Sequence, residues 1–165
     1  MSYYLEPEYE PFARGIFANT IEMLQFFSDR LGVFYPWNKY AQVVVRDFVS
    51  GAMENTSATL HGDFVQKNNR ELIDINHDGI ISHELFHQWF GDLVTCESWS
   101  HVSLNEGFAS YGEQLWIEHK GGRDAALKKC FQSMDRYIRY AADNEDMPII
   151  NYNYKDKDDM FNAIT

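Results

Sequence analysis

The sequence contains few cysteines and few basic residues. The first scarcity excludes a class of fold, and the second excludes a class of binding partner. Two cysteines among 165 residues are too few for the disulfide framework of a small secreted domain. Lys and Arg number 14 against 25 Asp and Glu, so the formal net charge is −11. Without a basic patch, we expect neither nucleic acid nor an anionic membrane as a partner. The acidic balance suits a cationic ligand such as the free amino terminus of a peptide, although solubility explains it equally well.

Long hydrophobic runs are also missing. No apolar segment approaches the roughly 20 residues that cross a bilayer, and the amino-terminal region lacks the charged and apolar parts of a signal peptide. The compartment therefore stays open between cytoplasm and periplasm or extracellular space. What the chain does contain is 45% hydrophobic and 16% aromatic residues, which is typical of a folded domain with a substantial core.

The most informative motif is His-Glu-Leu-Phe-His at residues 83–87, in an apolar segment that ends at Gly91. Positions four apart lie on one face of a helix, so His83 and His87 can bind the same metal ion. Glu84 lies beside them and can reach a water on that metal without being a ligand. The alternative is a surface helix that carries two unrelated histidines, and the apolar character of the segment argues against it.

A third ligand is predicted at Glu106, with eighteen residues separating it from His87. It lies on a second predicted helix, and antiparallel packing of the two helices would bring its carboxylate to the histidines. Two His and one Glu leave the fourth tetrahedral position of a zinc ion open, which is the catalytic pattern. We therefore expect one Zn²⁺ per chain. Zinc would acidify a water and polarise a carbonyl, while Glu84 acts as general base and passes the proton to the leaving amine, which is peptide-bond hydrolysis.

Three segments together resemble a known family. Residues 51–55 read Gly-Ala-Met-Glu-Asn, residues 83–92 read His-Glu-Leu-Phe-His-Gln-Trp-Phe-Gly-Asp, and residues 104–109 read Leu-Asn-Glu-Gly-Phe-Ala. In this order and spacing the chain resembles the zinc aminopeptidases of the membrane alanyl aminopeptidase family, peptidase family M1, which also contains leukotriene hydrolase. The resemblance implies a gluzincin with a thermolysin-like zincin fold that removes amino-terminal residues from peptides.

The resemblance also implies how substrate is held. Glu54 would bind the free α-amino group of the peptide, and Gly51 and Ala52 would offer backbone groups to its extended chain. Met53 and Asn55 belong to the same substrate-binding segment. A carboxylate at a fixed distance from the zinc pairs with an ammonium and so measures off one residue before the scissile bond. Outside this context, an exposed turn glutamate would be the better interpretation of Glu54.

The chain departs from the family pattern at one internal position and at both of its ends. Ser103 stands where the family usually has Trp, which we expect to alter local packing. The family's oxyanion-stabilising tyrosine lies in a Tyr-x-Lys-Gly segment, for which residues 160–165 look like the lead-in, and Tyr154 has no glycine at the expected place. The amino-terminal β-rich domain of the family is missing too. We therefore expect a catalytic-domain fragment of a larger enzyme, incomplete at both ends. Without the tyrosine, the rate of the separate fragment should be lower than that of the larger enzyme by on the order of a hundredfold or more.

The pattern of elements predicts an α+β fold, with a small sheet beside a helical body. We expect a single domain over 1–165, in which 1–76 holds a helix and the strands and 77–165 holds the zinc helices. The expected elements are a helix over 13–31, strands over 42–49 and 56–61, the zinc helix over 80–90, and helices over 104–120 and 123–142. The stripe expected to be buried on the last helix is Leu127, Cys130, Phe131, Met134, Tyr137, Ile138 and Ala141. Trp89, Phe90, Trp99 and Trp116 are expected in the core.

Two other functions remain open on the sequence. The chain could belong to an endopeptidase or another zinc hydrolase of the same fold, or to a non-catalytic binding module stabilised by zinc. Acetylation of the substrate's amino group distinguishes an aminopeptidase from an endopeptidase, because only aminopeptidase action requires that group to be free. The presence of Glu84 argues against the second, since a structural site has no use for a base. The remaining domains of the parent enzyme are expected partners, and the oligomeric state stays open.

Overall fold

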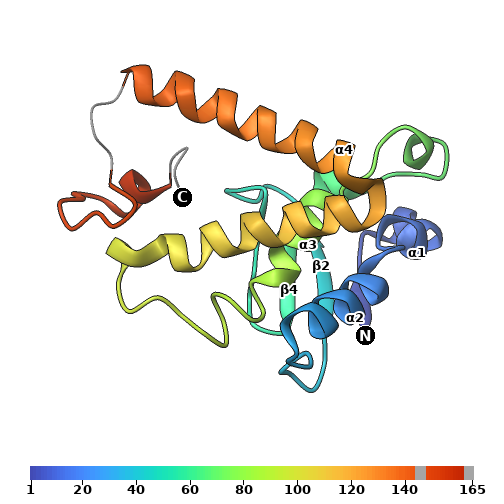
Figure 1. Cartoon of the computed structure of the whole chain (residues 1–165). Helices are drawn as coiled ribbons and strands as arrows, with labels where there is room; N and C mark the ends of the chain where they lie inside the picture. The colour runs from blue at the N-terminus through green and yellow to red at the C-terminus, as the bar shows by residue number, and fades with distance from the viewer. Residues whose placement is uncertain (144–147, 162–165) are drawn as a thin grey trace.

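A mixed sheet of four short strands forms one layer of the molecule (Figure 1). The computed structural model describes residues 1–143 and 148–161. In spatial order the strands are β1 (Ser2–Tyr4), β2 (Ala41–Val45), β4 (Ala58–Gly62) and β3 (Ala52–Met53). The first three run parallel, and β3 pairs antiparallel to β4 at the edge of the sheet.

Two strands differ from the expected ones. Backbone geometry determines where β2 ends, and pairing with a distant segment determines that β1 forms. β2 ends at Val45 rather than near residue 49, because the chain turns away through Asp47, whose φ is 51°. β1 is not among the elements expected from the sequence, the first of which was the helix over 13–31. Ser2 pairs with Ala41, and this pairing with a distant strand supplies the hydrogen bonds that make the segment a strand.

Four α-helices lie within the described residues, and the third of them contacts the second, the fourth and the edge strand β3. They are α1 (Ala13–Ile16), α2 (Thr20–Leu31), α3 (Asp78–Phe86) and α4 (Glu106–Asp143). Short 3-10 helices span Pro7–Phe12, Asp63–Val65, Glu71–Ile73, Trp99–Leu104 and Lys157–Met160. The single helix expected over 13–31 is interrupted, because α1 ends at Ile16 and α2 starts at Thr20. Helix α2 is followed by Gly32 in the left-handed conformation that favours glycine.

The long α4 is bent back on itself at Gly122, whose φ is 77°. The break was expected at this Gly-Gly pair, and Figure 1 shows the two halves, yellow and orange, forming a V. Gln114 donates to the carbonyl of Ala126 across the bend at 2.6 Å, and Glu113 pairs with Lys129 at 2.6 Å. None of the helices in the described ranges has both the length and the apolar character to cross a membrane.

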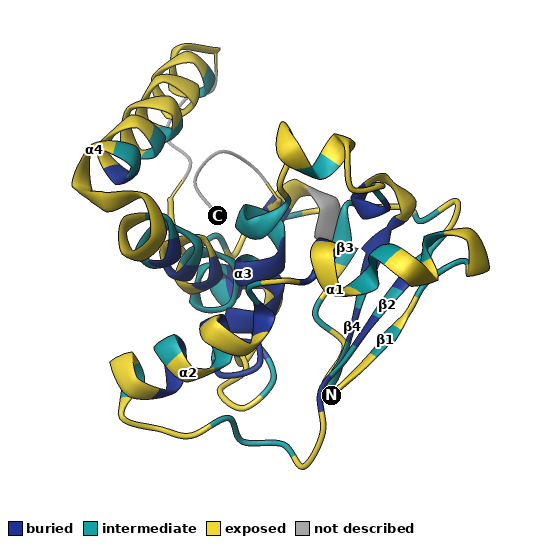
Figure 2. Cartoon of the chain, turned by 90° about the vertical axis from the view of Figure 1, so that its right-hand side faces the viewer, coloured by how far each residue is buried: buried dark blue, intermediate teal, exposed yellow. Residues whose placement is uncertain are grey.

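The core lies between α2, α3 and the first half of α4. Phe27 packs edge-on against Phe86 with 4.9 Å between ring centroids, and Trp116 is 1% exposed. Burying one such aromatic side chain stabilises the fold by about 1.5–3 kcal/mol. The central position of α3 appears in Figure 2, where most of it is dark blue. The metal motif on α3 is thereby held on a rigid element.

Two expectations about burial are wrong. The stripe on the second half of α4 is exposed, because this half diverges from the body of the molecule (Figure 2). Phe131, for example, is 63% exposed. Trp99 is also exposed, whereas Trp89 and Trp116 are buried as expected and Phe90 packs against the core while partly buried.

Candidate metal centre

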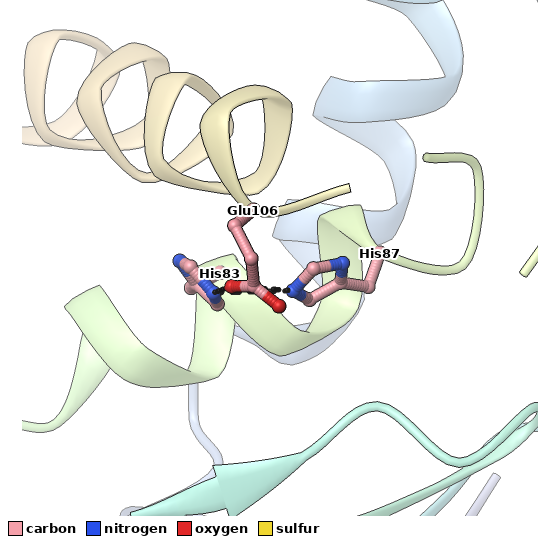
Figure 3. Close-up of side chains that lie close together, drawn as sticks. All are labelled: His83, His87 and Glu106. Atoms are coloured by element: carbon pink, nitrogen blue, oxygen red, sulfur yellow. Dashed lines mark hydrogen bonds and ion pairs between the residues drawn. The ribbon is translucent and has the colours of Figure 1, made fainter. Parts of the chain in front are cut away.

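Two helices bring three ligand atoms together. His83 lies on α3 and His87, one turn later, is the C-cap residue of that helix; their Nε2 atoms are 3.1 Å apart. Glu106 is the first residue of α4, and its Oε2 lies 3.3 Å from Nε2 of His83 and 3.6 Å from Nε2 of His87. Figure 3 shows the three side chains pointing toward one another.

The triangle of donor atoms has the size that a zinc ion requires. Tetrahedral zinc with bonds of about 2.0–2.1 Å places its ligand atoms roughly 3.3–3.4 Å apart. The separations in this triangle are 3.1, 3.3 and 3.6 Å. Two imidazole nitrogens and one carboxylate oxygen are also donors that zinc binds. The residues therefore fit the ion in both size and chemistry.

A tight turn after α3 fixes the orientation of the second histidine. Nδ1 of His87 lies 2.9 Å from the carbonyl oxygen of Phe90 and donates to it, which leaves Nε2 as the acceptor that faces the triangle. Gly91, with φ of 137°, allows this approach, since a Cβ there would lie 2.9 Å from Nδ1 of His87. Glycine is required at this position by both its backbone conformation and the space available.

Glu84 is buried beside this site, only 6% exposed. One of its carboxylate oxygens, one of Glu54 and a ring nitrogen of His87 all lie within 4.8 Å of one another. Burial raises the pKa of Glu84 to about 8, and the Glu54 and Glu106 carboxylates add to the shift while His87 opposes it. A bound cation would oppose this shift as well. Glu84 is thus a carboxylate with a raised affinity for a proton, as a general base requires.

The charges of the site favour a cation. Burial alone would lower the pKa of His87, but the Glu106 and Glu54 carboxylates raise it to about 9. Burial would raise the pKa of Glu106, but hydrogen bonds from His83 and His87 lower it to about 2. Three carboxylates thus surround two imidazoles in a poorly solvated place, and positive charge there is strongly stabilised.

The segment over 51–55 lies at the edge of the sheet next to the site. Ala52 pairs with His61 and Met53 with Leu60 in the antiparallel pairing of β3 and β4. This pairing carries Glu54 to a point where its Oε1 is 3.9 Å from Nδ1 of His87. The carbonyl of Gly51 is occupied, because it accepts from Gly62 N at 2.9 Å. Met53 and Asn55 are exposed beside it, and their roles stay predictions.

Two polar residues near the site were missed by the sequence analysis. Gln88 is 0% exposed and bonds to the segment that carries Glu54. Asp92 follows the turn, and burial raises its pKa to about 6 while a hydrogen bond from Thr56 opposes the shift. A polar side chain inside an apolar helical run was the available signal for Gln88, but its partners are distant in sequence.

Comparison with known proteins agrees with the motifs. The model of the Peptidase family M1 domain matches residues 16–165. Endoplasmic reticulum aminopeptidase 1 of Mus musculus is 35% identical over 124 residues, which are 70% of this chain and 13% of that protein. The chain thus spans about an eighth of the length of the curated relatives it matches.

Solved structures extend the similarity to the fold. LTA4 hydrolase from yeast is 27% identical with a TM-score of 0.82, over 99% of this chain and 26% of that one. A zinc metallopeptidase mutant from Deinococcus radiodurans, bound to a Tyr-Ser-Ala substrate, is 28% identical with a TM-score of 0.63, over 87% of this chain and 28% of that one. The expected zincin catalytic-domain fold, α+β with a small sheet and a helical body, is confirmed.

Proposed function

The chain belongs to peptidase family M1, and from this premise we propose that it is part of a zinc aminopeptidase that removes amino-terminal residues from peptides. The observation that carries the proposal is the triangle of donor atoms with two further carboxylates beside it. His83, His87 and Glu106 would hold the ion. When bound, zinc supplies a Lewis acid that polarises the scissile carbonyl and acidifies a water molecule.

The chain's own residues would move the proton and bind the substrate. Glu84 takes a proton from the attacking water and delivers it to the leaving amine, for which its buried carboxylate beside His87 is suited. Glu54 pairs with the ammonium of the substrate's amino terminus. An extended peptide can add along the edge strand β3, with Gly51 and Ala52 next to its backbone. The substrate complex of the Deinococcus relative, a tripeptide, supports a peptide ligand.

We further propose that residues 1–165 are one catalytic-domain piece, with 1–76 supplying the amine-binding segment and 77–165 the metal ligands. The chain spans about an eighth of its curated relatives, so the remaining domains of a parent enzyme would be its partners. The lead-in to the family tyrosine, residues 160–165, lies mostly outside the described residues, because 162–165 are not described. Low activity of the separate chain stays a prediction.

The test is hydrolysis of an aminoacyl reporter by the zinc-loaded longer enzyme and by this chain. The longer enzyme should cleave leucyl-aminomethylcoumarin and leave its N-acetyl form intact. Glu84→Gln should lower kcat by roughly 10²–10⁴-fold with zinc retained, whereas Glu118→Gln, on the exposed surface of α4, should not.

Each alternative has its own outcome in this test. Cleavage of the acetylated reporter would favour an endopeptidase or another hydrolase of the same fold. Zinc binding without any hydrolysis by the longer enzyme would favour a binding module. Equal rates for the chain and the longer enzyme would refute the proposal that the chain alone is impaired.

A further inference from the structure

Gln88 joins the metal-binding helix to the segment that carries Glu54. Its side-chain Nε2 donates to the carbonyl oxygen of Glu54 at 2.8 Å. Its Oε1 accepts from the backbone N–H of Ser57 at 2.8 Å and from the hydroxyl of Tyr35 at 3.2 Å. The side chain is completely buried, so these bonds are made away from water.

The chemistry of the side chain suits this bridge. A primary amide offers a donor and an acceptor in one plane, so it can bond to a backbone carbonyl and a backbone N–H at once. Gln88 does so with Glu54, which precedes the turn over 55–58, and with Ser57 inside that turn. The turn is closed by Ala58 N, which donates to Asn55 O at 2.8 Å. The backbone carbonyl of Gln88 accepts from Nε1 of Trp37 at 3.3 Å, which fixes the residue from a second side.

The bridge connects His87 to the main chain of the residue that carries the amine-binding carboxylate. Gln88 is bonded covalently to His87, and its amide reaches the main chain of Glu54 itself. At the far end, Oε1 of Glu54 lies 3.9 Å from Nδ1 of His87. A hydrogen bond from Thr56 to Asp92 is a second link between the same turn and the segment after α3.

We propose that Gln88 is a positioning residue, which holds the Glu54 carboxylate at a fixed separation from His87 and thereby sets recognition of the substrate's free amino group. This inference rests on the proposed function, because it takes Glu54 as the partner of the ammonium. Without the amide, the turn over 55–58 keeps its internal hydrogen bond but loses its fixed position against α3. The distance between ammonium site and metal then varies, and binding of the free amino group weakens.

The experiment compares three variants of the zinc-loaded chain. Gln88→Met keeps a similar volume and removes all three side-chain hydrogen bonds. Gln88→Glu keeps the acceptor for Ser57 and Tyr35, but replaces the donor to Glu54 with a carboxylate oxygen. Gln114→Met is the matched control, since Gln114 also donates to a backbone carbonyl but does so at the bend of α4. The probes are leucinamide and N-acetyl-leucinamide, measured by titration calorimetry, and Zn²⁺ itself.

Gln88→Met should raise the dissociation constant of leucinamide by about tenfold or more and leave zinc affinity nearly unchanged. The amide of Ser57 should exchange with solvent faster, by a similar factor, while the amide of His87, bonded within α3, keeps its rate. Gln114→Met should change none of these. If Gln88→Met does not fold, Gln88→Glu tests the loss of the donor to Glu54 by the same leucinamide and zinc titrations, with the bond from Ser57 retained.

Unchanged leucinamide binding in the Gln88 variants would overturn the inference. A parallel loss of zinc affinity would also overturn it, because Gln88 would then be a general support of the fold. Two other results would refute the proposed function itself. In one, the wild-type chain binds leucinamide and N-acetyl-leucinamide equally; in the other, Glu54→Gln leaves leucinamide binding intact. If Glu54→Gln weakens binding and Gln88→Met does not, only the positioning role of Gln88 is refuted.

Discussion

Replacing Gly112 by alanine should force apart the two helices that position the candidate metal ligands. Gly112 lies on α4, about one and a half turns after Glu106, and faces Phe86 of α3. A Cβ at position 112 would lie 2.3 Å from Cγ and 2.5 Å from Cδ2 of Phe86. Carbon atoms pack at roughly 3.5 Å, so one of the two helices has to move by about 1.2 Å relative to the other.

Phe86 cannot yield, because it is 1% exposed, stacks on Phe90 at 5.4 Å and meets Phe27 edge-on at 4.9 Å. The shift therefore falls on α4 and carries Glu106 away from the histidines. Overpacking of this kind costs about 3 kcal/mol, of which roughly 1 kcal/mol is regained from the better helix propensity of alanine. We expect unfolding free energy to fall by about 2 kcal/mol and zinc affinity to fall about tenfold or more.

Urea unfolding with and without zinc, together with zinc titration, measures both effects. Gly107→Ala is the matched control on the same helix, since the nearest atom to its Cβ would be Ser103 Cβ at 3.8 Å, an ordinary contact. This control should be neutral or stabilising by up to about 1 kcal/mol. If Gly112→Ala behaves like Gly107→Ala in both measurements, the spacing of the helices does not control the metal site.

Three further predictions concern the metal, a buried histidine and the core. Zinc at about 100 times its dissociation constant should raise the unfolding free energy by about 2.7 kcal/mol, and an equal gain in His87→Ala would show that the ion binds elsewhere. His61 is fully buried, and burial lowers its pKa to about 4. The ordinary pKa of histidine is about 6.5, so as the pH falls the unfolded chain takes up this proton before the folded chain does. The free energy of unfolding should therefore decline by about 2 kcal/mol between roughly pH 7 and pH 5. Comparison of wild type with His61→Gln in denaturant unfolding at each pH isolates this contribution, and identical slopes would contradict it. Phe27→Ala should cost about 3–5 kcal/mol, whereas Phe34→Ala, at 84% exposed, should cost within about 0.5 kcal/mol; thermal or urea unfolding that ranks the two equally would refute the position of the core.

Local order along the chain was sufficient to identify the family and the three candidate ligand side chains that the fold brings together. Residues four apart share a face on any α-helix, so the separation of His83 and His87 follows from the helix alone. The glycine pair at 121–122 likewise marked the break in α4, because its second member adopts a conformation that other residues rarely take. The motif-based membership of the family is confirmed by the match over residues 16–165.

Distances between segments were decided by the tertiary structure. Residues 2–4 become a strand by pairing with residues far along the chain, and the apolar stripe after Gly122 stays exposed because the helix bends away from the body. Periodicity in the sequence states which side chains share a face, but not which surface that face meets.

The sequence by itself determined which atoms can bind a metal, since helical spacing and side-chain chemistry are local properties. Only the folded chain decided that these atoms form a triangle of 3.1–3.6 Å. That closeness depends on Gly112, which lets α4 approach Phe86, while the turn at Gly91 orients His87 and the buried amide of Gln88 bonds to the turn behind Glu54. Each of these contacts joins residues through space, and sequence order does not specify such contacts.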